Sequence, residues 1–174
     1  IVAGAFAGRA VYRAPLFGDP YALFEVLGAT GDGNAADGVQ RQFNQLFPTG
    51  HIHLGYIDYV GWSNVIDVHG ALGWKPLGMH VWVDYHQFRF WDTRGRWLNA
   101  GGAVFVEADP LRTGSLMGDE VDLSFTVPIT PNVSVATSFS WFIPGAGAAT
   151  ARGSTVGRGR GMSTWGFLYI RSQL

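Results

Sequence analysis

Apolar and polar residues alternate along several segments of the chain, and such a period-two pattern predicts β-strands rather than helices. The clearest case lies between residues 118 and 144, where two alternating segments flank a short proline-bounded turn at residues 128–132. In the first segment one face carries Val121, Leu123, Phe125 and Val127, and the other carries Glu120, Asp122, Ser124 and Thr126. This predicts an antiparallel hairpin with one apolar face and one small, polar face.

Two further hairpins and a final strand are predicted in the same way. Residues 64–92 alternate on both sides of a turn at residues 75–78, and residues 2–30 do so around a turn at residues 16–20. The last segment, residues 161–174, predicts a single strand rich in aromatic residues. Its pattern leaves open which of its two faces would meet lipid.

The connections between the predicted strands alternate in length. Tight turns are expected at residues 14–19, 75–78 and 128–132, and long segments rich in Gly, Asn and Ala at about residues 31–63, 93–117 and 145–160. Outer-membrane β-barrels show this asymmetry, with short periplasmic turns and long extracellular loops. Soluble β-sandwiches also vary their loop lengths, but strict alternation is less expected of them. We therefore predict an all-β fold, namely a transmembrane, antiparallel up-and-down β-barrel.

The composition favours the same fold class. Charged residues make up 14% of the chain and apolar residues 47%, whereas globular domains carry about 25% charged residues. A protein whose outer surface faces lipid needs few charges to cover it. No apolar run reaches the roughly 18 residues of a membrane-spanning helix, and a closed barrel is the other structure that satisfies its backbone in hydrocarbon. The net charge of −1 gives no reason to expect a nucleic-acid partner.

The number of strands suggests that the barrel is larger than this chain. About seven strands are predicted, whereas single-chain bacterial barrels have an even number. An eighth strand at residues 97–106 would place the remaining long loops on the wrong side of the membrane. We therefore expect residues 1–174 to form a single barrel domain that is the C-terminal part of a larger barrel. Within it, residues 31–63 are expected to form a long extracellular loop that constricts the pore.

Several short motifs are distributed over the predicted loops and strands. They are Phe43–His51 (FNQLFPTGH), Leu54–Asp58, Val60–Asn64, Asp84–Arg89, Asn99–Ala103, Gly118–Asp122 and Ser140–Gly145. In this order they resemble the alginate export family of outer-membrane barrels, over about residues 40–174. The resemblance implies a monomeric barrel of about sixteen to eighteen strands in a bacterial outer membrane. It also implies that a polysaccharide or another hydrophilic solute passes through the lumen.

The strand parities assign nine ionisable side chains to the lumen. These pore-lining candidates are Arg9, Arg13, Glu25, Asp67, His69, Asp84, His86, Glu120 and Asp122. The resemblance implies a lumen rich in arginine and lysine, because guanidinium groups pair with carboxylates of a polyuronate through forked hydrogen bonds. The nine residues instead form a mixed set that leans acidic. They indicate either a hydrated, weakly selective wall or a network of salt bridges that stiffens the barrel.

The stretch FNQLFPTGH supplies the candidates for the constriction, which are Phe43, Asn44, Phe47 and His51. Its two phenylalanines and Leu46 offer apolar side chains for packing, and its proline and glycine favour turns. The stretch contains no nucleophile and no acid–base pair. We interpret it as an ordered lid segment that lies at the extracellular mouth or folds into it.

The sequence gives little support for a metal site or a catalytic site. Asp67, His69, Asp84 and His86 could ligate a metal from neighbouring strands, but D-x-H arises easily from alternation within a strand, and we expect no metal and no other cofactor. No G-x-S-x-G elbow supports a hydrolase, so no catalytic residue is assigned and no enzymatic activity is expected. The Gly/Arg stretch at residues 152–161 is interpreted either as a contact for lipopolysaccharide or anionic cargo, or as a solvated loop.

The sequence therefore predicts a porin-like channel for the passive passage of a hydrophilic solute, with outer-membrane lipid and lipopolysaccharide around it. Lumen width, loops and charges would decide what passes. Two alternatives stay open. One is a plugged barrel subunit of a larger envelope assembly, and the other is a barrel hydrolase.

Overall fold

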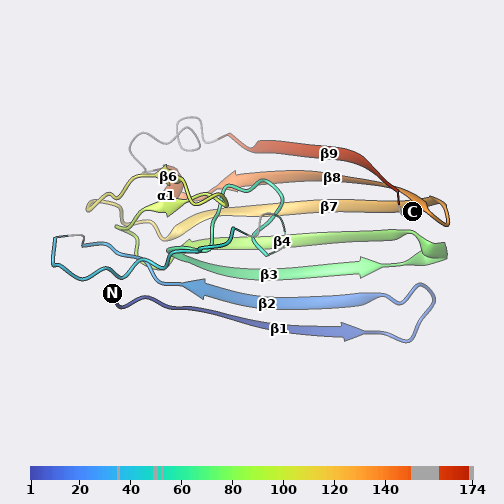
Figure 1. Ribbon diagram of the computed structural model, residues 1–174, viewed down its shortest axis with the longest axis horizontal. Coiled ribbons are helices and arrows are strands. Elements are labelled where there is room, and N and C mark those ends of the chain that lie inside the picture. Colours follow the sequence, from blue (N-terminus) through green and yellow to red (C-terminus); the bar gives the residue numbers. More distant parts are fainter. Residues whose placement is uncertain (35, 49–50, 52, 150–160, 173–174) are drawn as a thin grey trace.

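The chain forms a long antiparallel sheet in the computed structural model, which describes residues 1–34, 36–48, 51, 53–149 and 161–172 (Figure 1). Its strands are β1 (Ala5–Arg13), β2 (Tyr21–Ala29), β3 (Val65–Trp74), β4 (His80–Phe90), β7 (Leu116–Thr130), β8 (Val133–Pro144) and β9 (Ser163–Ser172). Each strand pairs with the next one in this order. The predictions of an all-β fold and of three hairpins followed by a last strand are therefore confirmed.

The remaining elements are short and lie between the long strands. β5 (Trp97–Leu98) and β6 (Val104–Val106) form a separate two-stranded sheet, so residues 97–106 add no strand to the main sheet. A 3-10 turn, η1 (Pro76–Gly78), and one helical turn, α1 (Ala146–Ala149), complete the described structure. Among the described residues, no helix has the length and apolarity needed to cross a membrane.

The tight turns gather at one end of the sheet and the long connections at the other (Figure 1). The turns after β1, β3 and β7 lie at the right of the figure, whereas β6 and α1 lie with the long loops at the left. This is the arrangement that the alternating loop lengths predicted. The Gly/Arg stretch falls mostly on residues 150–160, which lie outside the described residues.

The pairing register gives the sheet two faces of opposite character, because directly paired residues point to the same side. Glu25 pairs with His69, His69 with His86, and His86 with Glu120. We call the side that carries these four residues the loop-covered face, because residues 53–60 pack against it. We call the opposite side the bare face. Large apolar side chains on it are between 37% and 70% exposed, namely Phe24, Leu72, Val83, Phe139 and Leu168.

The hydrophobic core lies on the loop-covered face, where the long loop meets the sheet. The sheet contributes Leu27, Val65, Phe88, Phe90, Met117 and Phe142, and the connecting segments contribute Leu54, Ile57, Val60, Trp97, Val106 and Ala148. The core is therefore built between one face of the sheet and its own connections. Because no described segment covers the bare face, its apolar side chains remain exposed.

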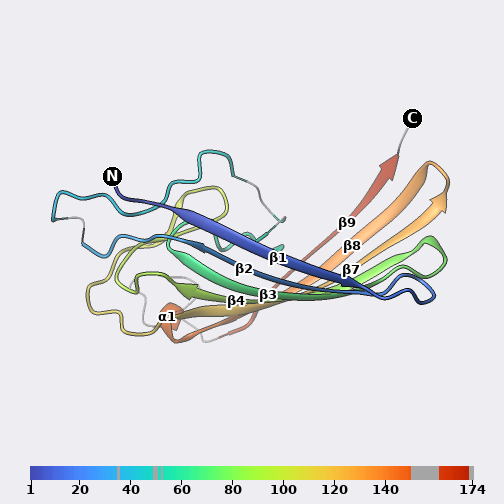
Figure 2. The same cartoon turned by 90° about the horizontal axis from the view of Figure 1, so that it is seen from below.

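The sheet is open, with β1 and β9 as its outer strands. It also twists strongly, so that the direction of the strands changes markedly from β1 to β9 (Figure 2). Single-chain barrels close with at least about eight strands, and the main sheet has seven. The described part of the chain therefore has the strand order of an up-and-down barrel without closing into one.

A charge introduced in the middle of the bare face should destabilise the protein in a bilayer. We expect Phe139→Arg to lower the free energy of unfolding by about 2–4 kcal/mol, because a charge near the bilayer midplane must leave water. Leu77→Arg is the control, since Leu77 is 82% exposed in the tight turn after β3, where we expect a cost of about 0–1 kcal/mol. Denaturant titration in phospholipid vesicles measures both, and equal costs would contradict a lipid-facing bare face.

Candidate functional site

An ion-paired chain of side chains crosses β1 to β4 on the loop-covered face. The Arg9 guanidinium donates from Nε to Glu25 Oε2. Glu25 Oε1 lies 3.7 Å from His69 Nδ1, and His69 Nε2 lies 2.9 Å from Asp84 Oδ1. Glu25 and His69 are only 2% and 5% exposed. Since a buried charge without a partner is costly, the pairing is what allows these groups to lie inside the protein.

A second buried pair lies beside the first. Asp67 Oδ2 lies 2.8 Å from His86 Nδ1, and both side chains are almost fully buried. The His86 ring stacks on the ring of His69, with centroids 4.0 Å apart and planes 12° apart. It also stacks on Phe88 at 5.3 Å. The two histidine–carboxylate pairs thus form one layer, held by hydrogen bonds between neighbouring strands and by ring stacking.

Two carboxylates on β7, Glu120 and Asp122, complete this layer and are fully buried. Asp84 is the register partner of Asp122, so these two carboxylates lie on adjacent strands. The described chain supplies Glu120 with a backbone donor, because the N–H of Ile57 donates to Glu120 Oε1 at 2.9 Å. A side chain of the sheet therefore binds the loop that covers it.

The nine pore-lining candidates share the loop-covered face, but they differ in exposure. Six are buried: Glu25, Asp67, His69, His86, Glu120 and Asp122. Asp84 is half-buried, whereas Arg9 and Arg13 on the outer strand β1 are exposed. Arg13 lies over the Tyr21 ring at 5.2 Å. Most of the set therefore contacts other parts of this chain, and its pore-lining role stays a prediction.

The segment that covers the sheet is residues 53–60 rather than FNQLFPTGH. Leu54, Ile57 and Val60 are buried in the core. Gly55 lets the segment approach the sheet, because its φ is +79° and a Cβ there would lie 2.4 Å from Glu120 Oε1. The position thus requires glycine for two reasons, backbone conformation and space. This turn belongs to the motif Leu54–Asp58.

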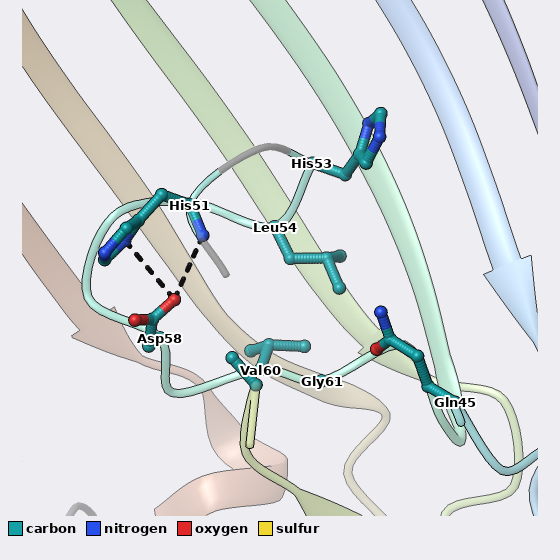
Figure 3. A pocket seen from close by; sticks show the side chains of 8 residues that line it. Gln45, His51, His53, Leu54, Asp58, Val60 and Gly61 are labelled. Carbon is teal, nitrogen blue, oxygen red and sulfur yellow. Dashed lines mark hydrogen bonds and ion pairs between the residues drawn. The ribbon is translucent and has the colours of Figure 1, made fainter. Parts of the chain in front are cut away.

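The four constriction candidates differ in burial and do not form one cluster. Phe43 is half-buried and packs against the core, whereas Asn44 is exposed and Phe47 is 82% exposed. The exposed His51 lies with its backbone N–H 3.2 Å and its Nδ1 3.4 Å from Asp58 Oδ1 (Figure 3). The expectation that both phenylalanines pack is thus wrong for Phe47, because Asn44, Leu46, Phe47 and Pro48 are exposed and only Phe43 packs against the core.

A small cavity lies within the loop, lined by Gln45, His51, His53, Leu54, Asp58, Val60, Gly61 and Ala100 (Figure 3). Its volume of about 10 Å³ has room for about one water molecule. It is too small for a sugar ring, so the loop is packed rather than hollowed into a binding pocket.

Tyr56 and His51 hold the loop to the far strand of the sheet. The Tyr56 ring is stacked with Trp165 of β9, with centroids 6.5 Å apart and planes 14° apart, and His51 lies 5.6 Å from the same ring. The Tyr56 ring also lies 5.7 Å from the ring of Phe167 on the same strand. Burial raises the pKa of this phenol, so it remains a neutral hydrogen-bonding group.

Two structural residues were not singled out from the sequence. Asn64 is fully buried at a φ of +53°. Its side chain accepts from Asp92 N at 2.8 Å and donates to the carbonyl oxygens of Asp92 and Arg96. Arg112 is 2% exposed and donates to the carbonyl oxygens of Thr93, Gly95 and Glu107. Asn64 lies in the motif Val60–Asn64, which was the available signal, whereas nothing in the sequence marks Arg112.

The described residues contain no group of three or more His, Asp or Glu side chains arranged to hold a metal ion. Although Asp67, His69, Asp84 and His86 lie close together, each histidine pairs with a different carboxylate. The arrangement is that of two separate histidine–carboxylate pairs.

Comparison with known protein families matches residues 1–161 to the family described as Alginate export. The chain therefore belongs to the alginate export family, a transport family of bacterial outer-membrane β-barrel proteins. The match includes residues 1–39, where the motifs alone were unspecific. No curated protein matches the chain.

Gly55 provides a test of the contact between the loop and the sheet. We expect Gly55→Ala to push residues 53–60 away from Glu120 and to speed amide hydrogen exchange in this segment about fivefold, the loss of about one hydrogen bond. Gly38→Ala is the matched control, because Gly38 lies in the same loop with a φ of +76° and nothing within 4 Å of an added Cβ. Mass spectrometry of the exchanged peptides measures both. Equal exchange in the two variants would show that the close approach to Glu120 does not hold the loop.

Proposed function

We propose that the chain forms part of the wall of a bacterial outer-membrane channel, through which a polysaccharide or another hydrophilic solute passes by diffusion without catalysis. The observation that carries this proposal is the inverted polarity of the sheet. Its bare face is apolar and exposed, whereas its loop-covered face holds a continuous layer of buried, ionisable side chains. The first face suits the acyl chains of lipid and lipopolysaccharide, and the second suits a hydrated lumen.

Further strands then complete the barrel. Among the described strands, β1 and β9 each pair on one side only, over nine or more residues, and backbone groups on a free edge cannot remain unpaired in hydrocarbon. We propose that these edges pair with other strands of a barrel of about sixteen to eighteen strands.

The exposed charges of the pore-lining set differ in sign from the set as a whole. The carboxylates of the pore-lining set are buried except for the half-buried Asp84, and Glu25, Asp67 and Asp84 are paired with cationic or imidazole groups. Arg9 and Arg13 are the members of this set that remain exposed. An anionic polysaccharide is therefore a suitable cargo, although the set as a whole leans acidic. Arginine suits this role because its fork binds a carboxylate through two hydrogen bonds.

The loop at residues 31–63 is then the constriction, with residues 53–60 as the part that enters the lumen. Tyr56 is its largest side chain that reaches across the sheet, to Trp165 on β9. The packing of residues 53–60 against the sheet also favours a second function, namely a plugged barrel that acts as a subunit of an envelope assembly. An open channel and a plugged subunit differ in whether they carry a current.

Planar-bilayer recording with the full-length protein tests the proposal. We expect single-channel currents, and a larger conductance for Tyr56→Ala, because this change removes a ring from the lumen while Leu54 and Ile57 still hold the segment. Leu46→Ala is the control, since Leu46 lies in the same loop but is 76% exposed, and its conductance should equal that of the wild type. Absence of current in all three proteins would favour the plugged subunit.

A further inference from the structure

A row of aromatic side chains follows β9 on the loop-covered face. Trp165, Phe167 and Tyr169 occupy alternate positions of the strand, and their register partners on β8 are Ser140, Ser138 and Ala136. Trp165 is 36% and Tyr169 41% exposed, and Phe167 is half-buried. We call these three side chains the aromatic row. Its exposure differs from that of Leu27, Phe88 and Phe142, which lie on the same face and are buried in the core.

The rings of the aromatic row are arranged in steps along the strand. The centroids of Trp165 and Phe167 lie 5.3 Å apart, and those of Phe167 and Tyr169 lie 5.2 Å apart with planes 14° apart. Trp165 meets Phe167 edge to face, with planes 61° apart, whereas the nearly parallel rings of Phe167 and Tyr169 are offset. All three side chains remain partly exposed.

The two ends of the aromatic row are fixed by other groups. At the loop end, Tyr56 and His51 pack on Trp165. At the turn end, the Arg171 guanidinium lies 5.7 Å from the Tyr169 centroid and donates to the Tyr169 hydroxyl group at 3.2 Å. The row thus begins beneath the constriction segment and ends at a cation.

The neighbouring strand keeps the aromatic row accessible from the side. Ser138 and Ser140 are small, and Ser138 Oγ forms a hydrogen bond with Ser124 Oγ at 2.8 Å across β7 and β8. Since these partners are short and almost fully buried, the rings of the aromatic row stand above them. The accessible surface therefore combines aromatic rings with one guanidinium.

A pyranose ring has the matching chemistry. Its C–H groups carry partial positive charge and contact the electron-rich face of an aromatic ring, whereas its hydroxyl or carboxylate groups bind polar side chains at the rim. We propose that the aromatic row is a binding track for successive pyranose rings of a carbohydrate chain, with Arg171 contacting an acidic group of the sugar. This inference rests on the proposed function, because it assumes that the solute reaches the loop-covered face.

The probe for this inference is an alginate hexasaccharide added to the full-length protein in a planar bilayer. We expect transient blocks of the current by the hexasaccharide, and a residence time about tenfold shorter for Trp165→Ala, the loss expected for one stacked ring. Leu168→Ala is the matched control, because Leu168 lies on the same strand but on the bare face, where it is 70% exposed. Its residence time should equal that of the wild type.

A polyethylene glycol of similar size separates stacking from simple obstruction. It enters a lumen without offering the C–H face of a sugar ring, so its residence time should be the same in the wild type and in Trp165→Ala. If Trp165→Ala does not fold, Tyr169→Ala supplies the same test at the other end of the row. Equal hexasaccharide residence times in the wild type and in the folded variant would overturn the inference.

Calorimetric titration of the hexasaccharide into the detergent-solubilised protein provides a readout that does not depend on conduction. Binding that Trp165→Ala weakens about tenfold, in a protein that carries no current, would overturn the proposed channel and support the binding track. A current without hexasaccharide binding and without hexasaccharide blocks would support the proposed channel and overturn the binding track.

Discussion

An antiparallel strand sends successive side chains to opposite faces of its sheet, and the rest of this structure depends on that constraint. The chain places Phe24, Leu72 and Phe139 on one face and Glu25, Asp67 and Glu120 on the other. In a soluble sheet the apolar side would be covered and the polar side would face water. Here the polar side is covered by the chain's own loop, and the apolar side is left exposed. This inversion makes sense when the surrounding solvent is lipid.

The covered face stays folded because its charges find partners within the sheet and the loop. Glu25 and His69 join neighbouring strands, and Glu120 accepts the N–H of Ile57 from a segment 63 positions away. Removing one partner would leave a buried charge unpaired, which is more costly than never having formed the pair. The layer and the loop therefore stabilise each other. Gly55 makes the contact possible, because any larger residue would strike the carboxylate.

Much of the fold could be predicted from local patterns. Alternation gave the strands from β1 to β4 and from β7 to β9, and the placement of the nine ionisable side chains on one face follows from the same period. The path of the loop could not be predicted in this way. Phe47 and Leu54 are both apolar, yet one is 82% and the other 7% exposed, and an irregular segment has no period that distinguishes them. Arg112 was missed for a related reason, since its partners are backbone carbonyl groups, which every residue carries.

The sequence by itself determined the strands, the hairpins, the alternation of short and long connections and the polarity of each face, because these depend on neighbours in the chain. Its motifs also indicated the family, which the match over residues 1–161 confirms. Only the tertiary structure decided that residues 53–60 cover the layer of ionisable side chains, that most of this layer is buried, and that Trp165 meets Tyr56. Those contacts join segments far apart in the chain, and their formation depends on shape and pairing across the whole sheet.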